Sequence, residues 1–237
     1  LESKTFTFDS GVTSIDEYFF YRSNVGTVTL STGITSIGRG AFAFCPFLKL
    51  SIPGHPANTY LTIGEGAFYK SALTVTSMPA EGLNIDNFGS HAFYSCNKIT
   101  TLTVNLYCNV PESAFEHFGI SSTTLTVSLK RKPGATTFYT IDTSAFAYSS
   151  ITKFTIDTYI TEVGDYAFAF SKLNQFDFKT DYKTTQTISE GAFYNCKFNN
   201  AIVIPETVKT ISAHAFANCI VDSVTIRGNS AGTEILE

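Results

Sequence analysis

The chain has 237 residues, and its 16 Lys+Arg against 20 Asp+Glu leave a formal net charge of −4. This length is ample for a packed core, and the acidic balance argues against nucleic-acid binding, which needs a basic face to neutralise phosphates. Charged residues make up only 15% of the chain, which excludes a disordered charged tail. No apolar run approaches the roughly 20 residues of a membrane-spanning helix, so we expect no membrane insertion within this chain.

A repeat explains most of the pattern along the chain. Its first copy holds Phe19-Phe20, and eight further copies hold Ala-Phe at the same place. The second residues of these pairs are, in chain order, Phe20, Phe42, Phe68, Phe93, Phe115, Phe146, Phe168, Phe193 and Phe216. Their spacing of 22 to 31 residues is typical of a solenoid in which each copy forms one coil. We therefore expect residues 1–237 to form a single solenoid of about nine coils.

Each copy predicts the same elements in the same order. An apolar residue such as Ile37 lies four positions before the Ala, and the Ala-Phe pair is too short for a full helix, so it predicts a turn or a one-turn 3₁₀ segment. An alternating apolar pattern follows, as at Ile151, Phe154 and Ile156, and predicts a short strand. Stacked coils make these strands parallel, and equivalent phenylalanines would stack as a ladder in a β-rich, helix-poor body. The aromatic excess is thus interpreted as a stacked core and not as an aromatic binding patch.

The cysteines follow the same repeat. Four of the five occupy one position, three residues after the motif Phe, namely Cys45, Cys96, Cys196 and Cys219. A buried structural ladder explains this, because a free Cys behaves as a small hydrophobic residue. A disulfide between Cys196 and Cys219 stays open as an alternative, since adjacent coils stack. No C-x-x-C or H-E-x-x-H motif is present, so we expect no metal site, no cofactor and no catalytic residue.

Two segments depart from the regular spacing. The widest interval contains Lys130 to Gly134, which we interpret as a surface loop inserted between coils. At the start of the chain, Thr5 to Phe8 has the alternating pattern of a strand whose Ala-Phe half would lie upstream. This pattern predicts that the chain is an excerpt of a longer protein.

The segments from Ile37 to Cys45 and from Ile204 to Cys219 resemble the BspA-type leucine-rich-repeat family. The repeat of that family has the form I-P-x-x-V-x-x-I-G-x-x-A-F-x-x-C-x-x-L, and the resemblance covers almost the whole chain. It implies a right-handed leucine-rich-repeat coil with one parallel strand per repeat. It also implies a cell-surface or secreted protein that adheres to host, matrix or neighbouring-cell proteins. Irregular spacing and frequent replacement of Leu by Phe, Ile or Val depart from the family pattern and affect the expected curvature.

Outward-facing strand positions supply the candidate binding surface. Because charge lends specificity, we select the later coils, with Lys153, Thr155, Asp157, Gln175, Asp177, Lys179, Thr225 and Arg227. The expected function is a non-catalytic protein–protein interaction module with a protein ligand, in keeping with the absence of any catalytic constellation. A structural spacer is one alternative. A carbohydrate-active solenoid enzyme is another, and it would need two carboxylates such as Asp157 and Asp177 to converge.

Overall fold

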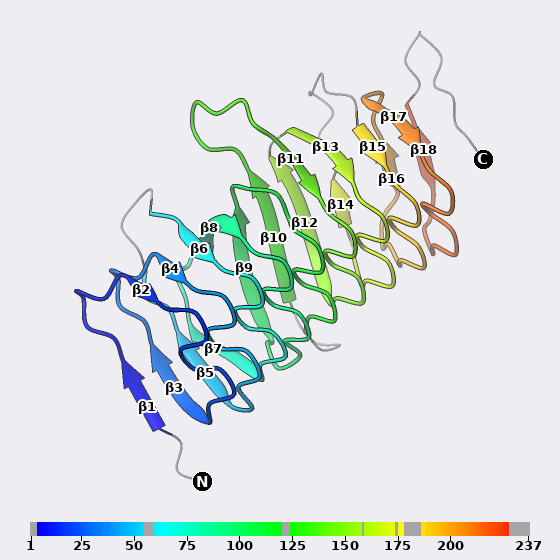
Figure 1. Ribbon diagram of the computed structural model, residues 1–237. Coiled ribbons are helices and arrows are strands. Elements are labelled where there is room, and N and C mark those ends of the chain that lie inside the picture. Colours follow the sequence, from blue (N-terminus) through cyan, green and yellow to red (C-terminus); the bar gives the residue numbers. More distant parts are fainter. Residues whose placement is uncertain are drawn as a thin grey trace.

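About nine similar coils of strand and turn are stacked along one direction in the computed structural model, from β1 at one end to β18 at the other (Figure 1). The structure describes residues 4–54, 59–119, 124–157, 159–173, 175–177 and 186–227. Within these ranges every regular element is a strand, and the strands pair in parallel. The prediction of a β-rich solenoid with stacked parallel strands is therefore confirmed.

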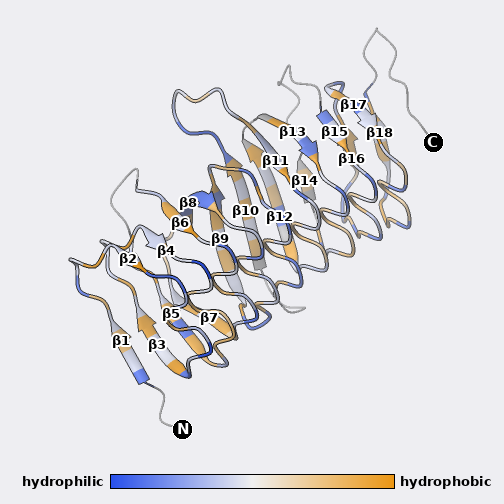
Figure 2. Ribbon diagram, in the orientation of Figure 1, coloured by the Kyte–Doolittle hydropathy of each residue, from blue (hydrophilic) through white to orange (hydrophobic). Residues whose placement is uncertain are grey.

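A strand follows each Ala-Phe turn, as the alternating pattern predicts. Together with β1, which precedes the first turn, these post-motif strands are β1 (Lys4–Thr7), β3 (Val25–Thr29), β5 (Leu48–Ser51), β7 (Leu73–Ser77), β9 (Thr101–Leu106), β10 (Thr124–Lys130), β12 (Ile151–Asp157), β14 (Gln175–Asp177), β16 (Ile202–Ile204) and β18 (Val224–Ile226). In β5, Leu48 and Leu50 are buried while Lys49 is exposed, and Figure 2 shows similar alternation along several strands. One side of each strand thus faces the core.

A second strand, which the repeat pattern did not predict, precedes most of the turns. These pre-motif strands are β2 (Ser14–Ile15), β4 (Ser36–Ile37), β6 (Leu61–Ile63), β8 (Leu83–Phe88), β11 (Phe138–Ile141), β13 (Tyr159–Val163), β15 (Gln186–Ile188) and β17 (Val208–Ile211). Each contains the apolar residue four positions before the Ala, such as the buried Ile37. Several have only two or three residues, so their alternation is too short to recognise in the sequence.

The two sets of strands change partners in the middle of the solenoid. One sheet contains β1, β3, β5 and β7, while the longest sheet has the order β14-β12-β10-β9-β8-β6-β4-β2. Strand β8 joins the two sets, because its first half pairs with β9 and its second half with β6. The buried Asn105 holds the junction by donating through Nδ2 to the Glu81 carbonyl at 2.9 Å and to Asn84 Oδ1 at 3.0 Å. The remaining sheets are β11-β13-β15-β17 and β16-β18.

The segment interpreted as an inserted loop is partly strand. Lys130 is the last residue of β10, and the connection to β11 begins after it. Lys132 in this connection donates through Nζ to Asp86 Oδ2 of β8 at 2.7 Å and lies 4.7 Å from the centre of the Tyr60 ring. The connection therefore packs back across the preceding coils.

The Ala-Phe segments are turns, the first of the two predicted alternatives. In every coil the residue before the Ala and the residue two after the Phe have positive φ, for example Gly40 and Phe44 at 57° and 58°. Fifteen such residues in the described part are not glycine, and each costs about 1–2 kcal/mol in this conformation. Three backbone hydrogen bonds per coil junction offset the cost, as in Gly40, Phe42 and Phe44 donating to the next coil at 2.7–2.9 Å.

The motif phenylalanines stack through the centre of the solenoid and are called here the inner ladder. Neighbouring ring centroids from Phe20 to Phe216 are 4.9–5.4 Å apart, with interplanar angles of 1–18°. This spacing is close to the distance between paired strands, so each coil contributes one ring. The adjacent Ala of each pair is buried wherever it occurs, as Ala41 and Ala145 are, because a larger side chain would push the coils apart.

Candidate binding surfaces

The structure brings five of the eight predicted binding residues onto the two neighbouring strands β12 and β14, namely Lys153, Thr155, Asp157, Gln175 and Asp177. Lys153 of β12 is the Cα partner of Gln175 in β14, and Thr155 is the partner of Asp177. Lys153 is exposed, and the half-buried Thr155 donates through Oγ1 to Ser128 Oγ at 2.9 Å. Lys179 and the side chains of Asp157, Gln175 and Asp177 lie outside the described residues.

The other two predicted residues belong to a different sheet. Thr225 pairs with Val203 in the two-stranded sheet of β16 and β18, and both Thr225 and Arg227 are exposed. Strand β16 contacts β14 without joining its sheet. The predicted surface is therefore divided between two sheets along the last four coils.

The two aspartates of the enzyme alternative do not occupy facing positions. Asp157 is on β12 and pairs with Lys130 of β10. Asp177 is on β14 and pairs with Thr155 of β12, which lies two residues before Asp157. The two aspartates are therefore offset by two residues in register. Positions two apart on one strand are separated by about 7 Å along it. The side chains of both aspartates lie outside the described residues.

The repeated cysteines donate hydrogen bonds to the preceding coil. Sγ of Cys96 donates to the Phe68 carbonyl at 3.0 Å, and that of Cys196 donates to the Phe168 carbonyl at 2.8 Å. All five cysteines are free thiols, including Cys219, so the alternative disulfide is not formed. Burial raises the pKa of the Cys196 thiol to about 12, which keeps it in the unreactive thiol form near neutral pH.

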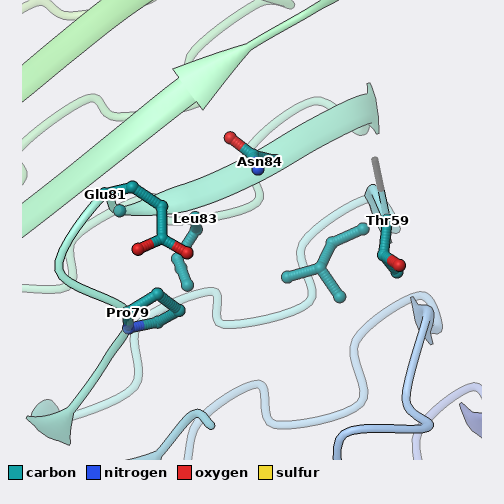
Figure 3. Close-up of a pocket in the computed structure, with 7 residues that line it drawn as sticks. Thr59, Pro79, Glu81, Leu83 and Asn84 are labelled. Atoms are coloured by element: carbon teal, nitrogen blue, oxygen red, sulfur yellow. The ribbon is translucent and has the colours of Figure 1, made fainter. Parts of the chain in front are cut away.

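The described residues contain no group of three or more His, Cys, Asp and Glu side chains placed to hold a metal ion. Within the same residues no helix has the length and apolar character to cross a membrane. A small hollow between β6, β8 and the turn from Pro79 to Gly82 has a volume of about 10 Å³, with Glu81 and Asn84 near it (Figure 3). That space holds at most one water molecule.

A second aromatic ladder runs along the outside of the turns, and the interpretation of the aromatic residues as core alone was wrong. It contains one ring from each of eight successive coils, namely Tyr21, Phe44, Tyr69, Tyr94, His117, Tyr148, Phe170 and Tyr194. Neighbouring ring centroids in this outer ladder are 4.7–5.9 Å apart. Tyr148 is 49% exposed, so the outer ladder meets solvent.

The signal for the outer ladder was present but divided between two positions. Where the residue after the motif Phe is Tyr, as at Tyr69, the next residue is not aromatic. Where it is Ala in the first eight coils, as at Ala147, the next residue is the ring, as at Tyr148. A search for one repeated sequence position misses this alternation.

Two cations lie against the outer ladder. Arg22 Cζ is 5.3 Å from the centres of the Tyr21 and Phe44 rings, and Lys70 Nζ is 5.2 Å from the centre of the Tyr69 ring.

The outer surface is hollowed over the first four coils. The hollow has a volume of about 240 Å³, and the small residues Gly40, Ala43 and Gly66 are among those that line it. Aromatic rings of the outer ladder and of Tyr18 also line it, together with Arg39 and Glu65, which form an ion pair with N and O atoms 3.2 Å apart. The carboxylate of Glu65 raises the pKa of Arg39, and Tyr18 adds to this through a hydrogen bond.

The repeat itself matches a known family of repeats. A family model described as a BspA type leucine rich repeat region matches residues 2–118 and 128–234, in six copies. No curated protein matches the sequence at a significant level. The match covers both the coils that carry the hollow and the coils that carry the predicted strand surface.

Proposed function

Because the chain belongs to the BspA-type leucine-rich repeat family, we propose that it is a non-catalytic module that binds a protein partner across its strand face. Repeats of this kind commonly mediate protein binding, and proteins that carry them are often associated with the cell surface. The proposal treats the chain as one continuous solenoid of a cell-surface or secreted protein. The partner is a protein of the host, of the extracellular matrix or of a neighbouring cell.

The observation that carries the proposal is the polar face of β9, β10, β12 and β14. Outward residues lie in register across these strands, with Thr103 beside Thr126 and Thr126 beside Lys153. The residues between them, such as Val127 and Phe154, are buried. Short hydroxyl side chains give hydrogen-bonding groups that lose little conformational entropy on binding. A broad, flat face of this kind suits a protein surface better than a small molecule, which prefers a concave site.

The charge on Lys153 makes the strand face testable against a matched site. Lys49 of β5 occupies the same repeat position, seven residues after the motif Phe, and both lysines are exposed. If the later coils bind the partner, Lys153→Glu should weaken binding about tenfold by reversing a charge at the interface, while Lys49→Glu should leave binding unchanged. Binding of the purified chain to immobilised extracellular-matrix and serum proteins would provide the partner for this measurement.

Two outcomes would contradict the proposal. An affinity that both variants reduce equally would place the partner elsewhere or indicate nonspecific charge attraction. A chain that binds no protein on intact cells or in matrix would favour the structural-spacer alternative. Antibody labelling of intact source cells tests the location separately, because an internal protein is labelled only after the cells are made permeable.

A further inference from the structure

The hollow on the turn side arises from two glycines in consecutive coils. The position before the motif Ala holds Tyr18, Gly40, Gly66 and His91 in the first four coils. A Cβ atom at Gly40 would lie 2.6 Å from Cε1 of Tyr18, so the Tyr18 ring lies directly over this glycine. At Gly66 the nearest atom to such a Cβ is Cβ of Tyr69 at 3.5 Å, so the space above Gly66 is open.

Three rings that line the hollow are perpendicular to their neighbours, unlike the stacked pair of Tyr148 and Phe170 in the later coils. Tyr18 and Tyr21 are at 89° to each other, and Tyr21 and Phe44 are at 87°. In the later coils Tyr148 and Phe170 are at 4° and cover each other's faces, which leaves ring edges toward solvent. The face of an aromatic ring is its electron-rich part. Arg22 lies over the Tyr21 and Phe44 rings, so the half-exposed Tyr18 is the ring of the hollow that a ligand can contact.

Charge around the hollow selects a neutral ligand. The Arg39 and Glu65 side chains at its rim are 53% and 56% exposed and neutralise each other, while both keep hydrogen-bonding atoms toward solvent. Arg22 already lies over the Tyr21 and Phe44 rings, so a cationic ligand would meet a like charge. An anionic ligand would meet Glu65 and the electron-rich rings. Neither a cationic nor an anionic ligand suits the hollow as well as an uncharged molecule that has both apolar C–H groups and hydroxyl groups.

We propose that this hollow binds a pyranose ring of a neutral glycan. The C–H groups on one face of a pyranose carry partial positive charge and pack on ring faces such as that of Tyr18. The hydroxyl groups of the pyranose accept hydrogen bonds from Arg39 and donate hydrogen bonds to Glu65. Such charge-assisted hydrogen bonds are among the stronger ones. A volume of about 240 Å³ is smaller than the sites of drug-sized ligands and suits a unit of one ring. This site is independent of the strand face proposed to bind protein.

A panel of neutral oligosaccharides built from glucose, mannose, galactose and N-acetylglucosamine tests the proposal. Calorimetry and saturation-transfer NMR with the intact chain should detect binding of at least one of them. Tyr18→Ala removes a wall of the hollow and should weaken that binding about tenfold. Gly66→Asn should have a similar effect by filling the open space. Asn is suitable there because it tolerates positive φ, as Asn195 and Asn218 do at 57° at the other positive-φ position of these turns.

Tyr148→Ala is the matched control, because Tyr148 is 49% exposed against 50% for Tyr18 but lies in the stacked part of the ladder. It should change affinity less than about twofold. No binding to any sugar of the panel at millimolar concentration would overturn the proposal. If Tyr148→Ala weakened sugar binding as much as Tyr18→Ala, the proposed location of the site would be overturned. If a proline-rich peptide bound in the hollow and no sugar did, the proposed ligand class would be overturned. Lys153→Glu should leave sugar binding unchanged, so failure of the strand-face proposal is seen separately.

Discussion

The inner and outer ladders place aromatic rings at nearly the same spacing but in opposite surroundings. Phe115 and Phe146 of the inner ladder are fully buried with ring centres 5.2 Å apart. Tyr148 and Phe170 of the outer ladder are 49% and 38% exposed with ring centres 4.7 Å apart. Ring contact is therefore common to both, and burial distinguishes them. Since removal of apolar surface from water is the larger energetic contribution, the inner ladder should dominate stability and the outer ladder should be free to bind.

Within the outer ladder itself, the first coils differ from the later ones. Glycine at positions 40 and 66 removes side chains that other coils keep, such as Tyr166 in coil seven. Tyr166 lies over Gly191, as Tyr18 lies over Gly40, and donates through its hydroxyl to Glu190 Oε1 at 3.1 Å. The same repeat thus yields a hollow where two glycines follow each other and a covered surface where only one occurs.

The largest effect is expected from the inner ladder. Phe115→Ala should lower the free energy of unfolding by about 3–5 kcal/mol, because it opens a cavity between Phe93 and Phe146 that the stacked coils cannot close. Urea unfolding followed by circular dichroism measures the change. Phe115→Leu, which keeps most of the volume, should lose clearly less. A loss below about 1 kcal/mol for the Ala variant would show that the ladder does not carry the core.

Alkaline pH should weaken the buried core through its cysteines. An unperturbed thiol has a pKa of 9.0, whereas burial raises the pKa of Cys45 to about 11 and that of Cys196 to about 12. Above pH 9 the unfolded chain therefore releases protons that the folded chain holds. The stability from these thiols is complete below that pH and is lost as the pH rises toward 11–12.

Urea unfolding below and above pH 9 measures this slope. Cys196→Ser keeps a donor for the Phe168 carbonyl, now 2.8 Å from the thiol, but does not titrate in this range. The variant should lose less stability than the parent chain on going to alkaline pH. An unchanged slope would mean that other groups cause the alkaline loss.

A smaller effect is expected from the outer ladder. Tyr148→Ala should lower the free energy of unfolding by about 1 kcal/mol, since exposed ring pairs contribute in that range beyond their buried area. A double-mutant cycle with Phe170→Ala isolates the ring contact from the loss of surface. A loss as large as that of Phe115→Ala would contradict the distinction by burial.

The smallest effect is expected outside both ladders, at the Lys132–Asp86 ion pair. Its side chains are 39% and 26% exposed, and the hydrogen bond to Asp86 raises the pKa of Lys132. Lys132→Ala should lower stability by less than about 1 kcal/mol, and salt should reduce the difference. Thermal unfolding at low and high salt measures it, with Lys49→Ala as a surface control. A difference that salt leaves unchanged would mean that packing on Tyr60 is the main contribution.

Much of the fold could be predicted because the repeat is periodic. The alternation at Ile151, Phe154 and Ile156 identified β12, and all three residues are buried. The pre-motif strands were missed because a segment such as Ser36–Ile37 is too short to show a period. The role of β8 as a junction was not predicted, because its two halves pair with different strands, β9 and β6. A local sequence pattern does not specify which strands pair.

The candidate sites could be predicted less well. Lys153 and Gln175 were placed on one face because strand side chains alternate, and they are Cα partners. Thr225 was assigned to the same surface by its repeat position, but β18 belongs to another sheet. The hollow could not be predicted, since it depends on the positive φ of Gly40 and Gly66 and on the orientation of the Tyr18 ring.

The sequence by itself determined the period, the interior position of the motif phenylalanines and the parallel stacking of coils, because these follow from residue size and apolarity repeated at a fixed interval. Only the tertiary structure decided how neighbouring outer rings are oriented, how the two sets of strands exchange partners at β8, and where the outer surface is hollowed. These features depend on contacts between neighbouring coils. A local pattern specifies what a coil contains, whereas its neighbours specify which way each side chain on its surface turns.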